Sequence, residues 1–302
     1  MSASNRIVMC EPTELYNILQ QQATIYPCLS DPNYLLLLDA RQTNEYNESH
    51  ILTSKKAPRS ENGDFLVPYD AELECKMYVI VVDNNTSLLQ EKGPALKCAK
   101  LLAEMGSRNP VKILRGGYEE FSALYPFLRT HKIIYMPQEL DELKPYPVEV
   151  LPGRLYLGTS EQVNRAAVRK DLKVKAIIHT SDDTGELEST LAAGIELKHI
   201  PFLDDDDADM YSKFAESCEF IGNYVKDAKS VLVCSDHGLS RSVTIVLVYL
   251  MHHYKWPLKD AFKHLQGCKW NIRPRRNFIQ QLSKWEMELF DETVTDITDT
   301  IY

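Results

Sequence analysis

Apolar and polar positions in the first half of the chain alternate between helical periodicity and short apolar runs. A helical pattern begins at Pro12 and leads to the run Tyr34–Leu38, which is typical of a buried strand. A second run, Met77–Val82, precedes a helix expected over 94–106, with proline early and glycine just past the end. A third run lies at Val111–Leu114. Strands that alternate with helices at this spacing predict a parallel α/β sheet.

The second half repeats this alternation after a break at 136–152. That stretch is rich in proline and acidic residues, which favours an exposed linker over a packed element. Beyond it, strands are expected at Val174–His179, Glu196–Ile200 and Ser230–Cys234, followed by three helices to about Phe290. We therefore expect an α/β protein of two domains, each with a central, mostly parallel sheet. The expected segments are a first domain over 10–132, a linker over 133–147, a second domain over 148–290 and a frayed acidic tail over 291–302.

Composition narrows the function classes. The 302 residues carry a net charge of −9, and the isoelectric point is about 5.5, so the basic footprint of a nucleic-acid-binding protein is absent. Any anion site must therefore be local. The longest apolar stretch, Val243–Met251, is shorter than the roughly 20 residues that a membrane-spanning helix needs. We expect neither a nucleic-acid partner nor a membrane span.

The seven cysteines point to a reducing compartment. Their number is odd and none forms a C-x-x-C pair, which argues against a zinc site and against a secreted disulfide framework. The first residues show neither a secretory signal nor an arginine-rich transit peptide. We therefore expect a cytoplasmic protein without a metal and without a cofactor.

The most informative stretch runs from Val231 to Ser242 and leads at once into an apolar helical pattern. A strand that turns sharply into a helix points several backbone N–H groups at one spot, and the helix dipole adds positive potential there. Arg241, at the start of the helix, can add two parallel hydrogen bonds to phosphate oxygens. We expect a phosphate-binding loop made of Ser235, Asp236, His237, Gly238, Leu239, Ser240 and Arg241.

This loop resembles that of the cysteine-dependent dual-specificity phosphatases, whose motif reads His-Cys-x-x-Gly-x-Ser-Arg-Ser. The register anchored on Gly238 and 240–242 places Ser235 at the nucleophile position and Cys234 at the preceding histidine. Adjacent residues at a strand end point to opposite sides, so Cys234 is not expected to act as the nucleophile. We interpret Cys234 as a small buried residue, with a redox role as the alternative. The resemblance covers about residues 148–290.

The serine changes the mechanism that this resemblance implies. A family cysteine reacts as a thiolate, whereas a serine hydroxyl titrates far higher and is not ionised by the same loop. We therefore predict binding without turnover, which means a catalytically inactive pseudophosphatase and no enzyme. Asp204 lies 31 residues before Ser235, the spacing of the family's general acid, and would then be a vestigial acid. A solvated acidic loop is the alternative interpretation of Asp204.

Two arginines near the end of the second domain add positive charge. Where the family commonly has a Pro-Asn pair, Pro274 is followed by Arg275 and Arg276. These arginines could extend the anion site, or they could form an ordinary surface cluster. Both interpretations stay open at the level of the sequence.

The first domain carries motifs of another kind. The segments 38–41 and 114–118 resemble those of a rhodanese-like domain, and the likeness extends over about residues 10–130. An active rhodanese places a nucleophilic cysteine in the loop after its central strand, but here Val82 is followed by Asp83. The resemblance therefore implies an inactive rhodanese-like domain with Asp83 at the degenerate position.

The order of the two domains resembles the mitogen-activated protein kinase phosphatases, in which the first domain docks the kinase through a basic cluster. The candidate cluster is Lys55, Lys56 and Arg59, and a solvated loop is the alternative. We expect a signalling pseudophosphatase that binds phosphorylated proteins, or that scaffolds or competes with kinases and active phosphatases. The alternative function is a protein-interaction module that ignores phosphate and acts through the rhodanese-like domain.

Overall fold

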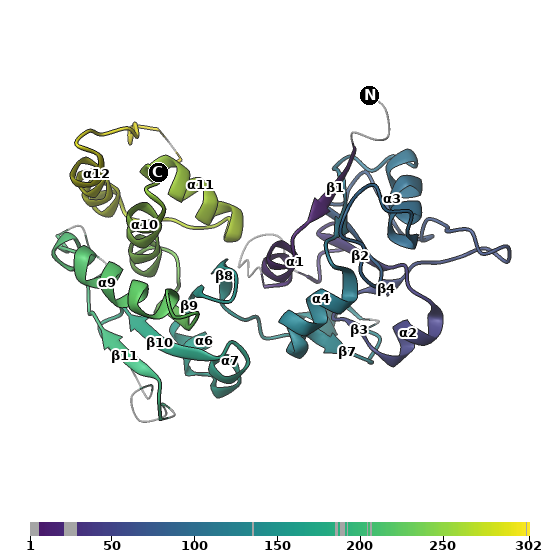
Figure 1. Ribbon diagram of the computed structural model, residues 1–302, viewed down its shortest axis with the longest axis horizontal. Coiled ribbons are helices and arrows are strands. Elements are labelled where there is room, and N and C mark those ends of the chain that lie inside the picture. The colour runs from purple at the N-terminus through teal and green to yellow at the C-terminus, as the bar shows by residue number, and fades with distance from the viewer. Residues whose placement is uncertain are drawn as a thin grey trace. The chain divides into compact units, whose positions relative to one another are not determined.

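The chain forms two compact units, Met1–Lys144 and Pro145–Tyr302, each with its own five-stranded sheet and flanking helices (Figure 1). This confirms the predicted α/β class with two domains and mostly parallel sheets. The predicted limits of the domains stay predictions. The computed structural model describes residues 6–20, 29–134, 136–184, 187, 191, 193–203, 205, 207–299 and 301–302.

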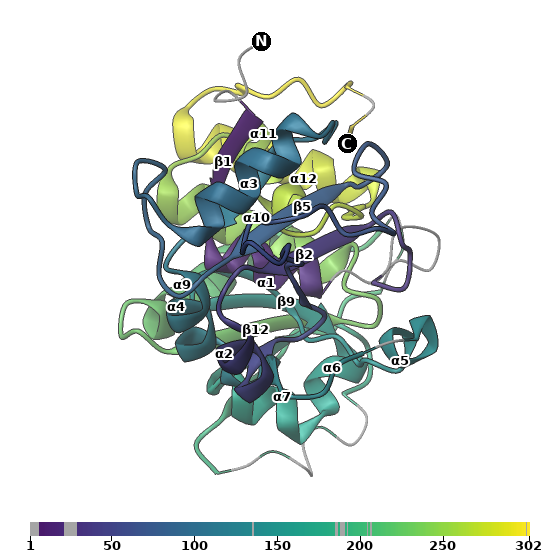
Figure 2. The same cartoon turned by 90° about the vertical axis from the view of Figure 1, so that its right-hand side faces the viewer.

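The sheet of the first unit consists of the apolar runs found in the sequence. Its strands follow the order β1 (Ile7–Cys10), β6 (Val111–Leu114), β5 (Tyr78–Val82), β2 (Leu35–Asp39) and β4 (Lys55–Lys56), and every neighbouring pair is parallel. Helix α3 (Pro94–Glu104) packs against β1, β5 and β6 (Figure 2). The inner strands are apolar at successive positions because both of their faces are covered.

Short elements surround this sheet. Helix α4 (Gly117–Leu124) begins at a glycine with φ 56°, where an added Cβ would lie 2.5 Å from backbone atoms of Asp83 and Asn84. Only glycine therefore lets this helix start against the loop after β5. The remaining elements are α1 (Pro12–Leu19), α2 (Thr43–Glu48), α5 (Pro137–Asp141), a 3-10 turn at Pro126–Leu128, and the antiparallel pair of β3 (His50–Ile51) and β7 (Arg129–Thr130).

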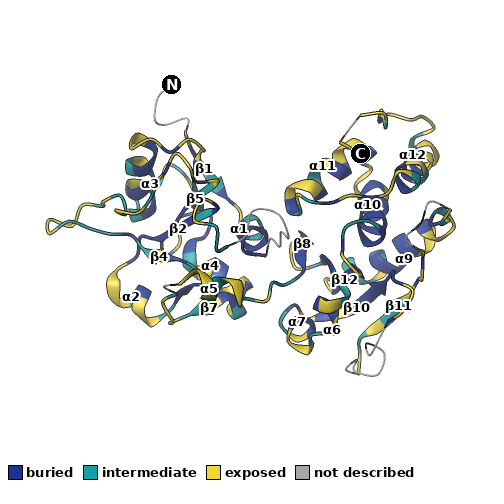
Figure 3. Ribbon diagram, turned by 180° about the vertical axis from the view of Figure 1, so that it is seen from behind, coloured by how far each residue is buried: buried dark blue, intermediate teal, exposed yellow. Residues whose placement is uncertain are grey.

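The second unit is built around one of its own helices, which is buried. Its strand order is β11 (Glu196–His199), β10 (Val174–His179), β12 (Ser230–Ser235), β9 (Leu155–Thr159) and β8 (Val148–Leu151), of which only β8 and β9 pair antiparallel. Helix α10 (Arg241–Tyr254) is buried from Arg241 to Met251, as an all-round apolar helix requires (Figure 3). Its neighbours are α9 (Phe214–Val225), α11 (Leu258–Cys268) and α12 (Arg276–Phe290), while α6 (Ser160–Asn164) and α7 (Ala166–Asp171) adjoin the strands. No helix in the described ranges has the length and apolarity to cross a membrane.

The proline-rich stretch is more structured than the sequence predicts. Helix α5 begins at Pro137, in the first helical turn, where the missing N–H of proline costs nothing. Strand β8 follows Pro147, and all four of its residues are buried. A proline is tolerated just before such an edge strand because it interrupts no ladder of hydrogen bonds. The expectation of an exposed linker over 136–152 is therefore wrong for β8, whereas α5 contains no buried residue.

The described residues after α12 are anchored, not frayed. The buried carboxylate of Glu286 accepts hydrogen bonds from the N–H groups of Val294, at 3.0 Å, and Thr295, at 2.9 Å. The ring of Tyr302 packs 5.0 Å from that of Phe262. The tail lacks a helical period, but a buried carboxylate needs donors, and the tail backbone supplies them.

Candidate functional site

The loop after β12 lies at the carboxyl end of the parallel strands, where α/β proteins usually place their sites. Within the part of the chain that the structure describes, the backbone N–H groups of Asp236, His237 and Leu239 donate to no acceptor of the protein. Helix α10 starts immediately after this loop and has 14 residues. Free N–H groups at a helix N-terminus create a positive potential that suits an anion.

Gly238 shapes this loop. Its φ of 64° lies in the left-handed region, and an added Cβ would lie 2.7 Å from the carbonyl oxygen of Gly158 in β9. Its N–H group donates to Ser235 Oγ over 3.2 Å. Glycine at this position therefore allows the loop to turn tightly against the neighbouring strand.

Ser235 and Cys234 lie on opposite sides of β12. Ser235 Oγ is 2.9 Å from Ser242 Oγ, so its side chain faces the loop. Cys234 is fully buried, and its Sγ lies 3.6 Å from the carbonyl oxygen of Ile178 in β10. Burial raises the pKa of the Cys234 thiol, with a further contribution from the negative charge of Asp236. The thiol is therefore protonated at neutral pH and turned away from the loop.

Arg241 is held by oxygen atoms on two sides. Its Nη1 donates to the carbonyl oxygen of Phe202 over 2.8 Å, and its Nη2 donates to Asp236 Oδ2 over 2.6 Å. The carboxylate of Asp182 lies further off, with Oδ1 3.9 Å from Nη1. These contacts fix the guanidinium beside the loop. Asp204, expected as a vestigial acid, lies outside the described residues.

The sequence interpretation missed two residues beside the loop. His179 ends β10 and is fully buried, with Nε2 3.1 Å from Ser160 Oγ, which in turn lies 3.4 Å from Asp236 Oδ1. Burial lowers the pKa of His179, and the nearby His199 lowers it further. The ends of parallel strands meet at one edge of a sheet, so the strand ends at 159 and 179 were the signal available in the sequence.

A pocket of about 450 Å³ opens beside the loop. The N–H of Arg273 donates to the carbonyl oxygen of Leu239 over 2.8 Å, so the following arginine segment is tied to the loop. Arg275 and Arg276 both line this pocket, and Arg276 Nη1 donates to the carbonyl oxygen of Ile297, so an extension of the anion site stays a prediction beside an ordinary surface cluster. No group of three or more potential metal ligands occurs in the described ranges. The residues that line the pocket are Ser235, His237, Leu239, Ser240, Arg241, Arg273, Pro274, Arg275, Arg276 and Tyr302.

The degenerate position of the first unit has a structural role. Asp83 follows β5 directly and is 3% exposed. Its Oδ1 accepts the N–H of Thr86 at 3.0 Å, and its Oδ2 accepts the N–H of Ala95 at 3.2 Å. The carboxylate therefore closes its own loop and caps the start of α3.

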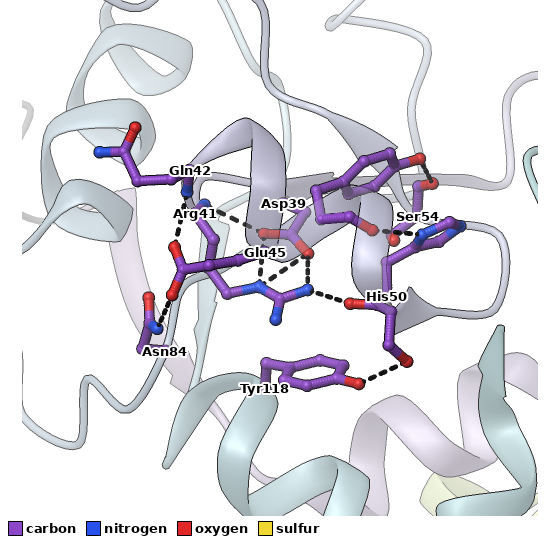
Figure 4. Close-up of polar contacts among 10 residues, drawn as sticks. Asp39, Arg41, Gln42, Glu45, His50, Ser54, Asn84 and Tyr118 are labelled. Carbon is purple, nitrogen blue, oxygen red and sulfur yellow. Dashed lines mark hydrogen bonds and ion pairs between the residues drawn. The ribbon is translucent and has the colours of Figure 1, made fainter. Parts of the chain in front are cut away.

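A buried ion pair ties together the loops at the same end of this sheet (Figure 4). Arg41 Nη2 lies 2.7 Å from Asp39 Oδ2, and both side chains are less than 5% exposed. The Arg41 guanidinium carbon lies 3.7 Å from the ring centre of Tyr118, whose hydroxyl group donates to Ser49 Oγ over 2.7 Å. These contacts hold together the end of β2, the residue that follows α2 and the start of α4.

The candidate docking cations are engaged within their own unit. Lys55 Nζ lies 3.2 Å from Asp70 Oδ2, with both side chains more than half exposed. Lys56 donates to the hydroxyl group of Thr43, and Arg59 donates to a backbone carbonyl over 2.9 Å. Kinase docking by this cluster, and the alternative of phosphate-independent interactions, stay predictions.

Comparisons with known proteins find a similar family for each unit. Residues 155–288 match the dual specificity phosphatase catalytic domain, and residues 12–124 match the rhodanese-like domain.

Dual specificity protein phosphatase 5 of Rattus norvegicus is 29% identical over 242 residues, which are 72% of this chain and 62% of the relative. Dual specificity protein phosphatase 4 of Homo sapiens is 28% identical over 294 residues, 84% of this chain and 73% of the relative. The crystal structure of the human tyrosine phosphatase-like serine/threonine/tyrosine-interacting protein has a TM-score of 0.42 at 24% identity, over 46% of this chain and 95% of that one. The chain spans less than two thirds of the length of the rat relative.

These comparisons correct one expectation. The prediction that the chain is not an enzyme is wrong, because the matching family model is a catalytic domain and the relatives are named protein phosphatases. The prediction depended on the single hydroxyl group of Ser235. A serine is a nucleophile in other hydrolases when a neighbour takes its proton, so its presence does not by itself exclude turnover. The chain thus consists of two α/β domains, of which the first is similar to rhodanese-like domains and the second to the dual specificity phosphatase catalytic domain.

Proposed function

We propose that the second unit binds the phosphate group of a phosphorylated signalling protein in the loop Ser235–Arg241. The observation that supports this proposal is that backbone N–H groups without an acceptor among the described residues line the same pocket as Arg241. Hydrogen bonds to a charged group contribute about 1.5–3 kcal/mol each, so a few of them suffice for specific binding.

The partners and the location extend this proposal. The relatives are named protein phosphatases, so phosphorylated signalling proteins are the class of partner that we propose. Kinases and active phosphatases, which the protein would scaffold or compete with, belong to that class. The cysteines of the described ranges that the structure records are free thiols, which suits a reducing compartment such as the cytoplasm.

The test is the substitution Arg241→Lys. Lysine keeps the positive charge but cannot form two parallel hydrogen bonds, so the affinity for inorganic phosphate should fall about tenfold. Isothermal titration calorimetry with phosphate and with phenyl phosphate measures the affinity. Release of phenol in the same samples measures turnover.

The matched control is Arg154→Lys. Arg154 donates to the carbonyl oxygen of Val225 over 2.9 Å in the same unit, and it does not line the pocket. Its replacement should leave phosphate affinity unchanged. Equal affinities for the Arg241 variant and the unmodified protein would refute the proposal.

A further inference from the structure

Arg241 already has an anionic partner inside the protein. Its Nη2 donates to Asp236 Oδ2 over 2.6 Å, while its Nη1 donates to the carbonyl oxygen of Phe202 over 2.8 Å. The Arg241 side chain is only 6% exposed. A phosphate group that accepts two hydrogen bonds from the guanidinium would therefore need a position that the Asp236 carboxylate already occupies.

Of these two partners, Asp236 is the one that can leave. Its side chain is 49% exposed, and rotation about its own bonds frees Nη2 while the loop backbone stays in place. Freeing Nη1 would instead require the main chain at Phe202 to move. Binding of phosphate therefore requires displacement of the Asp236 side chain.

The negative charge of Asp236 is present at neutral pH. Burial raises the pKa of its carboxyl group, but the neighbouring Ser181 hydroxyl group and the guanidinium of Arg241 outweigh this effect, so the pKa lies below its ordinary value. Asp182 adds a second carboxylate 3.9 Å from Nη1. The two carboxylates offset the positive charge that Arg241 would otherwise present to an anion.

We propose that Asp236 determines the selectivity of this loop by acting as a resident carboxylate ligand of Arg241, which a phosphate group must displace. This inference rests on the proposed phosphate-binding function. A peptide carboxylate that takes the place of Asp236 gains nothing, because it exchanges one singly charged carboxylate for another. A phosphate group on an acidic peptide segment can displace Asp236, because this ligand also reaches other arginines of the same pocket. These arginines are Arg273, Arg275 and Arg276.

The test compares Asp236→Asn and Asp236→Ala with the unmodified full-length chain. Removal of the resident charge should tighten the binding of inorganic phosphate about tenfold, measured by isothermal titration calorimetry. The matched control is Asp182→Asn. The carboxylate of Asp182 lies near the same guanidinium, but it is 60% exposed and too distant for a hydrogen bond. Its effect on affinity should stay within about twofold.

Acetate gives a second measurement. The vacated position in the Asp236→Ala variant should accept an external carboxylate, so acetate should compete with phosphate there and not in the unmodified protein. Competition by acetate that is equally strong in both proteins would overturn the inference. Thermal melting of every variant verifies that the second unit is folded.

The outcomes separate this inference from the proposed function. If the unmodified protein binds phosphate and the two Asp236 variants bind it equally or more weakly, the inference is wrong and the phosphate-binding function stands. If neither the unmodified protein nor the Asp236 variants bind phosphate, both are wrong. If the Asp236 variants bind phosphate more tightly while the Asp182 variant does not, and acetate competes in the Asp236→Ala variant, the results support both the inference and the proposed function.

Discussion

Two of the buried arginines in the described ranges, Arg41 and Arg241, lie beside an aspartate, and their surroundings give them different roles. Arg41 is closed in by Asp39, by a backbone carbonyl and by the ring of Tyr118, so it holds loops together. Arg241 also faces an aspartate, but it lines a pocket, and its carboxylate partner is half exposed. The same ion pair is therefore structural where it is covered and exchangeable where one side is open.

The covered pair leads to a prediction for the first unit. Asp39→Asn leaves the Arg41 guanidinium buried without a counter-charge, so the free energy of unfolding should fall by about 3–5 kcal/mol. Urea denaturation followed by hydrogen exchange of peptides from the first unit measures the loss. Asp70→Asn removes the partner of Lys55 from an exposed pair and should cost less than about 1 kcal/mol. Equal losses for the two variants would contradict the structural role of Asp39.

At the scale of elements, one carboxylate connects three segments of the second unit. Glu286 in α12 is fully buried and accepts the N–H of Leu258 at the start of α11, at 2.7 Å. It also accepts the N–H group of Thr295 at 2.9 Å and the hydroxyl group of Thr295 at 2.7 Å. The tail that carries Tyr302 to the pocket is therefore held in place by a side chain remote from the loop.

Glu286→Gln tests this connection. The amide keeps one acceptor oxygen but turns an N–H donor toward backbone donors, so the free energy of unfolding should fall by about 2–4 kcal/mol. Urea denaturation followed by tryptophan fluorescence measures the change. Glu292→Gln, an exposed substitution in the same tail, should have an effect within about 0.5 kcal/mol. A Glu286 variant as stable as the Glu292 variant would show that the tail is not anchored in this way.

At the scale of the whole molecule, the two units carry different reporters. All three tryptophans, Trp256, Trp270 and Trp285, lie in the second unit, together with the candidate phosphate site. Tryptophan fluorescence therefore follows the unfolding of that unit alone. Hydrogen exchange of peptides from β2 and β5 follows the first unit.

Phosphate should stabilise one unit and not the other. At 100 times its dissociation constant, a ligand that binds only the folded state adds about 2.7 kcal/mol to the free energy of unfolding. We expect this shift in the tryptophan signal and none in the exchange of β2 and β5 peptides, with sodium chloride at equal ionic strength as the control. An equal shift in both signals would indicate a general salting effect of phosphate and not a site.

The sequence by itself determined the fold class, since apolar runs of strand length separated by helical patterns leave a layered α/β arrangement as the way to bury them. The sequence also indicated where the loop lies, because the roles of Gly238 and Arg241 follow from local backbone geometry and charge. It misled where a property depended on distant partners: β8 and the tail are ordered by contacts that their own composition does not encode.

The tertiary structure alone decided which groups meet beside the loop. His179, Ser160 and Asp236 come from three elements and meet because the ends of β9, β10 and β12 lie at one edge of the sheet. It likewise decided that Arg241 is bound to Asp236 and to the main chain at Phe202. Sequence patterns record the period of an element and the residues inside a loop, whereas the partner of a charged group is set by which side chains packing leaves within hydrogen-bond distance.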